Sequence, residues 1–80
     1  MTGRRTVVRP GARTFNLNGR MVDVATLDEA RSLWCALRDA EQLGASDMVR
    51  GCGEYREGGV LAARVSYNGR LWWPDGAEIR

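Results

Sequence analysis

The chain has 80 residues, of which 44% are hydrophobic and 28% are charged, and its formal net charge is +2. This length allows one small domain with a single core, and the composition is typical of a folded chain rather than a disordered one. No stretch approaches the ~20 apolar residues that span a bilayer, and no apolar segment follows the basic start as it would in a signal peptide, so we expect a cytoplasmic protein.

Charge is distributed unevenly along the chain. Residues 1–20 contain five arginines and no acid, whereas residues 21–57 contain eight acids and four arginines. Lysine and histidine do not occur, so every cationic side chain is a guanidinium, which binds carboxylate or phosphate in a bidentate manner and stacks on aromatic rings. The uneven distribution favours a polar partner surface. Codon usage in a high-GC genome would explain the arginines without any function.

Residues 1–12 predict a basic N-terminal arm, and residues 13–80 predict a single domain. The arm is polar and closes with Pro10-Gly11, and such arms become ordered only when docked. The candidate phosphate contacts are Arg4, Arg5, Arg9 and Arg13. A solubilising tail is an equal alternative for the arm.

The first element of the domain is expected to be a β-hairpin. Two alternating runs, residues 13–17 and 20–24, flank Asn18-Gly19, which is the strongest short-range signal for a hairpin. A two-residue turn pairs Leu17 with Arg20. The buried face then consists of Phe15, Leu17, Val22 and Val24.

One amphipathic helix is predicted over residues 27–43. Thr26 and Glu29 form a capping box, in which the Thr26 hydroxyl accepts a backbone N–H and Glu29 reaches back to the cap. Gly44 is expected to end the helix as its C′ residue. At about 100° per residue, the stripe that covers the sheet consists of Leu27, Ala30, Leu33, Trp34, Leu37 and Ala40.

Cys35 lies on the opposite side of this helix from the apolar stripe. Either Cys35 is exposed, or the arm or a second subunit covers it, and the usual burial of free cysteine favours a cover. In the cytoplasm, Cys35 and Cys52 are expected to be reduced thiols rather than a disulfide.

Three strands are predicted after the helix, over residues 49–57, 60–67 and 70–73. Gly58-Gly59 and Asn68-Gly69 are predicted to connect them as two-residue hairpin turns, and the glycines near Cys52 indicate a bulge or an edge. The predicted fold is therefore α+β: one domain of order ββαβββ, with an antiparallel sheet of about five strands packed on one amphipathic helix.

The last turn decides which of two adjacent tryptophans faces outward. A two-residue turn pairs Val65 with Trp72 and places Trp72 on the helix side. Trp73 is then outside, alongside Arg64 and near Arg70. The face toward the helix is predicted to consist of Leu61, Ala63, Val65, Tyr67 and Trp72.

The sequence does not support catalytic or metal chemistry. Without His or Lys, the usual general bases and Schiff-base amines are missing. Arg50 would lower the pKa of Cys52, but only Glu54 and Glu57 are available there to carry protons. Two distant thiols do not make a zinc site, and no complete phosphate-binding glycine motif occurs. We expect no catalytic residue, no metal, no cofactor and no small-molecule substrate.

Two kinds of partner remain. A nucleic acid would be bound by the basic arm and by stacking aromatic residues, although the acids in the middle of the chain argue against it. A protein would be bound by an exposed sheet face that carries Trp, Tyr and Arg. The candidate partner-binding residues are Arg20, Tyr55, Arg64, Tyr67, Arg70 and Trp73. The alternative for Trp73 is that the tail, residues 75–80, covers it.

Two segments carry a resemblance to known proteins. Leu-Gly-Ala-Ser-Asp-Met from Leu43 and Arg-Val-Ser-Tyr-Asn-Gly-Arg-Leu-Trp from Arg64 resemble short reading frames of phages and genomic islands in high-GC bacteria. In size, compactness and lack of catalytic residues, the chain is also similar to anti-CRISPR proteins.

This resemblance implies a non-enzymatic inhibitor that binds a multi-subunit CRISPR effector complex and blocks recruitment of target DNA. Many such inhibitors mimic DNA with strongly acidic surfaces, whereas this chain is basic, so steric blocking is expected instead. The alternative is a small nucleic-acid-binding regulator that uses the arginine-rich arm and the sheet aromatics, and a toxin–antitoxin component or phage structural accessory is a third reading.

Overall fold

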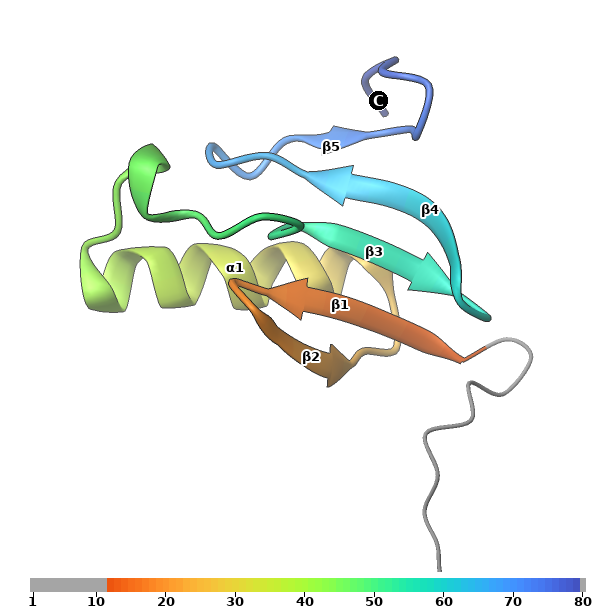
Figure 1. Ribbon diagram of the computed structural model, residues 1–80, viewed down its shortest axis with the longest axis horizontal. Helices are drawn as coiled ribbons and strands as arrows, with labels where there is room; N and C mark the ends of the chain where they lie inside the picture. The colour runs from red at the N-terminus through yellow and green to blue at the C-terminus, as the bar shows by residue number, and fades with distance from the viewer. Residues whose placement is uncertain (1–11, 80) are drawn as a thin grey trace, which may run out of the picture.

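A five-stranded antiparallel sheet with one α-helix against one face makes up residues 12–79, the part of the chain that the computed structural model describes (Figure 1). The elements are β1 Arg13–Leu17, β2 Arg20–Asp23, α1 Leu27–Glu41, the 3₁₀ turn η1 Ala45–Asp47, β3 Glu54–Glu57, β4 Val60–Val65 and β5 Leu71–Trp72. The sheet order is β2-β1-β3-β4-β5, which confirms the predicted α+β fold. Three of the predicted phosphate contacts, Arg4, Arg5 and Arg9, lie outside the described residues.

The hairpin of β1 and β2 has the predicted register, with Leu17 opposite Arg20. Asn18 and Gly19 have φ of 50° and 100°, the left-handed conformation that a type I′ turn requires at both central positions. The predicted buried face is confirmed: Phe15 and Val24 are buried in the core, while Leu17 and Val22 pack against it.

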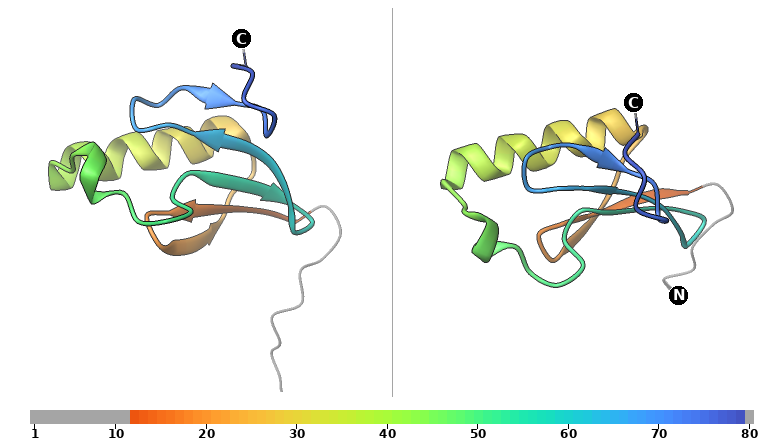
Figure 2. Two further views of the ribbon diagram at one scale, coloured as in Figure 1. Left: turned by 45° about the horizontal axis from the view of Figure 1, so that its top comes forward. Right: turned by 90° about the horizontal axis from the view of Figure 1, so that it is seen from above.

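Helix α1 covers one face of the sheet and begins at the predicted capping box (Figure 2). The Thr26 hydroxyl accepts the N–H of Glu29 at 3.0 Å. The Glu29 carboxylate accepts the N–H of Ala25 at 2.6 Å, one residue before the cap rather than at the cap itself. The first bond satisfies a donor that the helix leaves without an intrahelical partner, and the second ties the preceding residue to the first turn.

The end of the helix differs from the prediction, because Gln42 rather than Gly44 takes the left-handed position, with φ of 53°. The N–H of Gln42 donates to the carbonyl of Asp39, and the N–H of Leu43 donates to the carbonyl of Arg38 at 2.9 Å. This pair of bonds is a Schellman motif, and it ends the helix two residues before the predicted boundary.

Trp34 and Phe15 are fully buried and form the centre of the core. Five of the six residues predicted for the helix stripe face the core, but Ala40 is exposed. The last turn of α1 extends past the ends of the strands (Figure 1).

Cys35 is half-buried, and the turn between β4 and β5 covers it. A Cβ placed on Gly69 would lie 2.9 Å from the Cys35 Sγ. Within the described residues, an element of the domain itself therefore contacts this thiol. Cys35 and Cys52 are both free, as predicted.

The hairpin of β3 and β4 turns at Gly58-Gly59 as predicted, with φ of 61° and 86°. A bulge next to Tyr55 shifts the register, so that Leu61 pairs with Arg56. Leu61 therefore lies on the same face as Arg56, away from the helix. This extra residue reverses the side-chain alternation, which is why Leu61 does not face the helix as predicted.

The turn between β4 and β5 contains three residues, 67–69, instead of the predicted two. Ser66 donates its N–H to the carbonyl of Arg70, and Gly69 donates its N–H to the carbonyl of Ser66. A type I′ turn needs positive φ at both central residues, but here Gly69 has it and Asn68 does not.

This longer turn moves β5 by one residue, so that Arg64 pairs with Trp72 and Val65 with Leu71. Leu71 therefore packs against the core, and Trp72 lies on the other face with Arg64, which corrects the predicted placement of Trp72. Trp73 is exposed, as predicted, to 49%.

The C-terminal tail pairs with the outer edge of β5. Trp73 donates its N–H to the carbonyl of Ala77, and Ile79 donates its N–H to the carbonyl of Leu71, both at 2.8 Å. The tail thus covers the strand edge and leaves the ring of Trp73 exposed. None of the helices in residues 12–79 has the length and apolar character that a membrane crossing requires.

Candidate partner-binding groove on the open face

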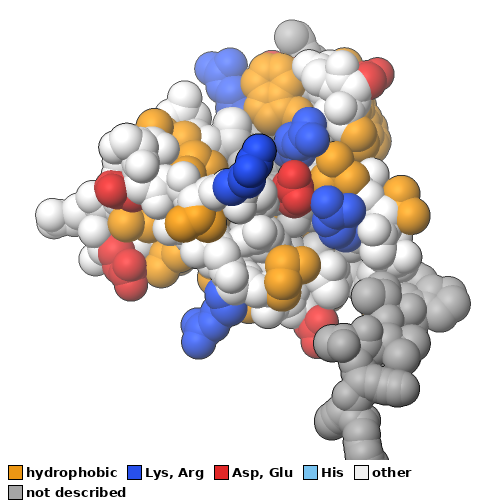
Figure 3. Space-filling model, viewed as in Figure 1, with side chains coloured by type: hydrophobic (Ala, Val, Ile, Leu, Met, Phe, Trp, Pro, Cys, Tyr) orange, Lys and Arg blue, Asp and Glu red, His pale blue; other side chains and the backbone are white. Residues whose placement is uncertain are grey.

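Within residues 12–79, no α-helix covers the face of the sheet opposite α1, and we call this face the open face (Figure 2). Its central side chains come from neighbouring strands: Glu54 and Arg56 from β3, Arg64 from β4 and Trp72 from β5. Figure 3 looks onto this face and shows basic side chains around an acidic one, with apolar side chains beside them. The open face therefore combines charge with exposed apolar surface.

A groove of about 430 Å³ lies at the β5 end of the open face. The loop before β3 forms one side, the end of β4 and its turn form the floor, and β5 with the following turn forms the other side. Its lining residues are Met48, Cys52, Arg64, Val65, Ser66, Tyr67, Trp72, Trp73 and Gly76.

Gly53 holds the loop before β3 against the end of β4. Its N–H donates to the carbonyl of Asn16 at 2.9 Å, and its carbonyl accepts the N–H of Val65 at 2.8 Å. Its φ is +89°, and a Cβ there would lie 2.2 Å from the Val65 oxygen. Only glycine fits this position. The two backbone bonds of Gly53 hold the preceding residue, Cys52, at the groove.

Trp72 lies between two arginines on the open face. Arg64 is its cross-strand partner, and Arg70 precedes it by two residues, so both share its side of the sheet. Among the described residues, neither Arg64 nor Arg70 has a carboxylate partner, whereas Arg56 binds Glu54 at 3.0 Å. Two guanidinium groups near the groove are thus available for an external anion.

The thiol of Cys52 contributes apolar surface rather than a nucleophile. Burial raises its pKa, so the thiol stays protonated at neutral pH. Within the described ranges, no group of three His, Cys, Asp or Glu residues is placed to hold a metal ion.

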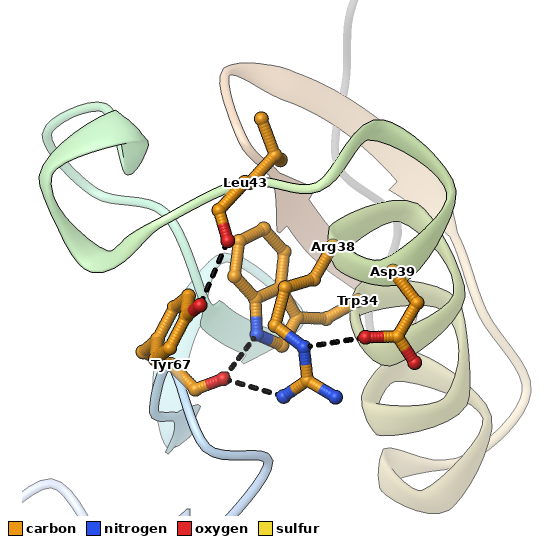
Figure 4. Close-up of polar contacts among 5 residues, drawn as sticks. All are labelled: Trp34, Arg38, Asp39, Leu43 and Tyr67. Carbon is orange, nitrogen blue, oxygen red and sulfur yellow. Dashed lines mark hydrogen bonds and ion pairs between the residues drawn. The ribbon is translucent and has the colours of Figure 1, made fainter.

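Tyr67 was predicted to bind a partner, but its polar atoms are used inside the protein (Figure 4). Its carbonyl accepts hydrogen bonds from Trp34 Nε1 at 3.1 Å and from Arg38 at 2.8 Å. Its hydroxyl donates to the carbonyl of Leu43 at 2.7 Å. A hydrogen bond from Arg38 to Asp39 raises the pKa of Arg38, which keeps this guanidinium charged. Tyr67 therefore anchors the β4–β5 turn to the helix.

Tyr55 was also predicted to bind a partner, but its side chain is only 4% exposed and belongs to the core. It lies on the helix side because it pairs with Phe15 across β1 and β3. Burial raises the pKa of its hydroxyl, which donates a hydrogen bond to Glu57 at 3.1 Å. Tyr55 is therefore a core residue and not part of the open face.

Two of the predicted arginine contacts lie away from the groove. Arg20 is exposed at the start of β2, the edge strand farthest from β5. Arg13 forms an ion pair with Glu57 at 3.5 Å and donates a hydrogen bond to the carbonyl of Ala25, so it stabilises the fold.

Of the predicted partner-binding residues, Arg64, Tyr67 and Trp73 line the groove, and Arg70 lies two residues before Trp72 outside the lining. Sequence reasoning missed Trp72, Met48 and Cys52 as groove residues. The alternation of β5 would have identified Trp72 if the length of the preceding turn had been known.

Comparison with protein-family models, with curated proteins and with solved structures finds no match to this chain.

Proposed function

We propose that this chain is a non-catalytic binding protein whose groove on the open face docks onto a macromolecular partner. The observation that supports this most directly is that Trp72, Trp73 and Arg64 line one groove, and that neither Arg64 nor the neighbouring Arg70 has a carboxylate partner among the described residues. Trp and Arg are the residues that most often dominate binding energy at protein interfaces.

The charge of the domain favours a protein over a nucleic acid as the partner. Residues 12–79 carry ten acids and eight arginines, so the domain itself is not basic. Nucleic-acid-binding modules usually carry a clear excess of positive charge. A partner protein with a few acidic groups suits this domain better than a continuous phosphate backbone.

The specific partner we propose is a multi-subunit CRISPR effector complex, with the protein acting as a steric inhibitor of target DNA recruitment. This choice rests on the resemblance in size and composition to anti-CRISPR proteins. We place the interaction in the cytoplasm, and the free thiols of Cys35 and Cys52 are consistent with a reducing compartment.

The test is a mobility-shift experiment with labelled target DNA and a purified CRISPR effector complex, with and without this protein. We expect the protein to release DNA from the complex and to shift no DNA alone. Trp73→Ala should raise the inhibitory concentration by roughly 30-fold, the equivalent of about 2 kcal/mol. The matched control is Val60→Ala, because Val60 is 69% exposed and lies outside the groove.

Two results would reject this proposal in different ways. If the complex keeps its DNA at saturating protein, the proposed partner is wrong. If the protein alone shifts DNA and the shift fades steeply with salt, the function is nucleic-acid binding.

A further inference from the structure

The side chains around Trp72 define the chemistry of a ligand, and this inference rests on the binding function proposed above. We infer that the groove accepts a segment of a partner protein in which carboxylates flank one apolar or aromatic side chain. The argument depends on the arrangement of Arg64, Arg70 and Trp72.

The three side chains form a compact unit. Arg64 lies directly across from Trp72 on the neighbouring strand, at the ~5 Å separation of cross-strand partners. Arg70 is two residues from Trp72, roughly 7 Å along the chain. Arg64 and Arg70 therefore both lie next to Trp72 on the open face, one across the strand pair and one along the chain, so a ligand docked over Trp72 would lie near both arginines.

Within the described part of the protein, the two arginines of this unit have no carboxylate partner. Four of the arginines there bind internal carboxylates, namely Arg13, Arg31, Arg38 and Arg56. Arg64 and Arg70 do not, although Glu54 lies across from Arg64, because Glu54 is bound to Arg56. A carboxylate supplied from outside would form the bidentate bonds that guanidinium favours.

The remaining lining of the groove suits an apolar side chain. Met48, Trp73 and the protonated thiol of Cys52 line the groove together with Arg64 and present apolar surface there. A volume of about 430 Å³ is near the small end of ligand pockets, enough for one or two side chains. Asp75 adjoins the lining residue Gly76, so a chain of phosphates would meet a negative charge there.

The experiment is an NMR titration that follows the three tryptophan indole N–H resonances. The probes are the short peptide Gly-Glu-Phe-Glu-Gly with blocked ends, the same peptide with Gln in place of both Glu, and a short oligothymidine. The signals of Trp72 and Trp73 are assigned with Trp73→Phe. Trp34 serves as an internal reference, because its indole is buried and bonded to Tyr67.

We expect the acidic peptide to shift Trp72 and Trp73 but not Trp34, and the Gln peptide to bind at least about tenfold more weakly. Arg64→Gln and Arg70→Gln should each raise the Kd of the acidic peptide by about tenfold. Arg20→Gln is the matched control and should leave it unchanged, because Arg20 is also exposed and has no carboxylate partner in the described structure.

Equal binding of both peptides, or shifts produced by oligothymidine and not by the acidic peptide, would overturn the inference. Failure of this inference can be distinguished from failure of the proposed function. If Trp73→Ala weakens inhibition of the effector complex but the acidic peptide does not bind, the ligand chemistry is wrong and the binding function stands. If the peptide binds as expected but the complex is not inhibited, the ligand chemistry stands and the proposed partner is wrong.

Discussion

The indole N–H of Trp34 donates a hydrogen bond of 3.1 Å to the carbonyl oxygen of Tyr67, 33 residues further along the chain. Arg38, one turn after Trp34, donates to the same oxygen at 2.8 Å. Two donors from the helix thus bind the carbonyl at the start of the β4–β5 turn (Figure 4). This contact connects the core to the turn that sets the position of Trp72.

Trp34→Phe should lower the free energy of unfolding by about 2–3 kcal/mol, because it leaves a cavity in the core and removes one hydrogen bond. Urea unfolding followed by far-UV circular dichroism measures the change. Trp73→Phe is the control and should change stability by less than about 0.5 kcal/mol. Equal effects of the two substitutions would mean that Trp34 is not the central core residue.

Tyr67→Phe should cost about 1 kcal/mol, because the carbonyl of Leu43 loses its hydroxyl donor while the ring remains. Tyr67→Leu should cost more, about 2–3 kcal/mol, since it also removes the edge-to-face contact with Trp34 at 6.3 Å and the contact with Arg38. Thermal unfolding of the three proteins provides the comparison. If Tyr67→Phe has no effect, the hydroxyl does not anchor the turn.

The two Asn-Gly turns should respond differently to the same substitution. Asn18 has φ of 50°, accepts the N–H of Val49 at 2.8 Å and donates to the carbonyl of Asp47 at 3.3 Å. Asn18→Ala should therefore cost about 2 kcal/mol. Asn68 has neither positive φ nor a side-chain hydrogen bond within the described residues, so Asn68→Ala should cost less than about 0.5 kcal/mol. Chemical denaturation of both variants tests the difference, and similar losses would contradict the three-residue turn.

Gly53→Ala should destabilise the protein by about 3 kcal/mol or more, because the left-handed backbone is strained and the new Cβ meets the Val65 oxygen at 2.2 Å. Gly76 is a matched control, since its φ is +98° but nothing lies within 4 Å of a Cβ there. Gly76→Ala should cost only about 1–2 kcal/mol, the backbone strain alone. Melting temperatures that fall equally would show that the Gly53 contact with β4 is unimportant.

Stability should decrease at alkaline pH. Burial raises the pKa of Cys52, and burial with a hydrogen bond to Glu57 raises the pKa of Tyr55. The folded chain holds both protons more tightly than the unfolded chain, whose ordinary pKa values are about 8.5 and 10. The stabilising contribution is therefore complete below those values and is lost as the pH rises through the higher folded values.

Urea unfolding at several pH values from neutral to about 11 measures this decline. The control is the double variant Cys52→Ser and Tyr55→Phe, in which neither group titrates over this range. Its stability should decline less steeply than that of the natural chain. An unchanged slope would mean that other groups cause the loss at alkaline pH.

Much of the fold could be predicted from local signals. The Asn18-Gly19 turn, the capping box at Thr26 and the paired glycines between β3 and β4 each act over a few residues, and each lies where it was predicted. Alternation and helical periodicity then identified Phe15 and Trp34 as the core. These features depend on the conformational preferences of neighbouring residues, so the sequence by itself determined them.

The groove could not be predicted in the same way, because contacts between distant residues decide it. Asn68-Gly69 has the same local preference as Asn18-Gly19, yet it lies in a three-residue turn whose carbonyl is bound by Trp34 and Arg38. That single added residue moves Trp72 from the helix side to the open face and places it beside Arg64. A strand changes faces with every one-residue shift, so only the tertiary structure, through these long-range hydrogen bonds, decided that Trp72 lies on the open face.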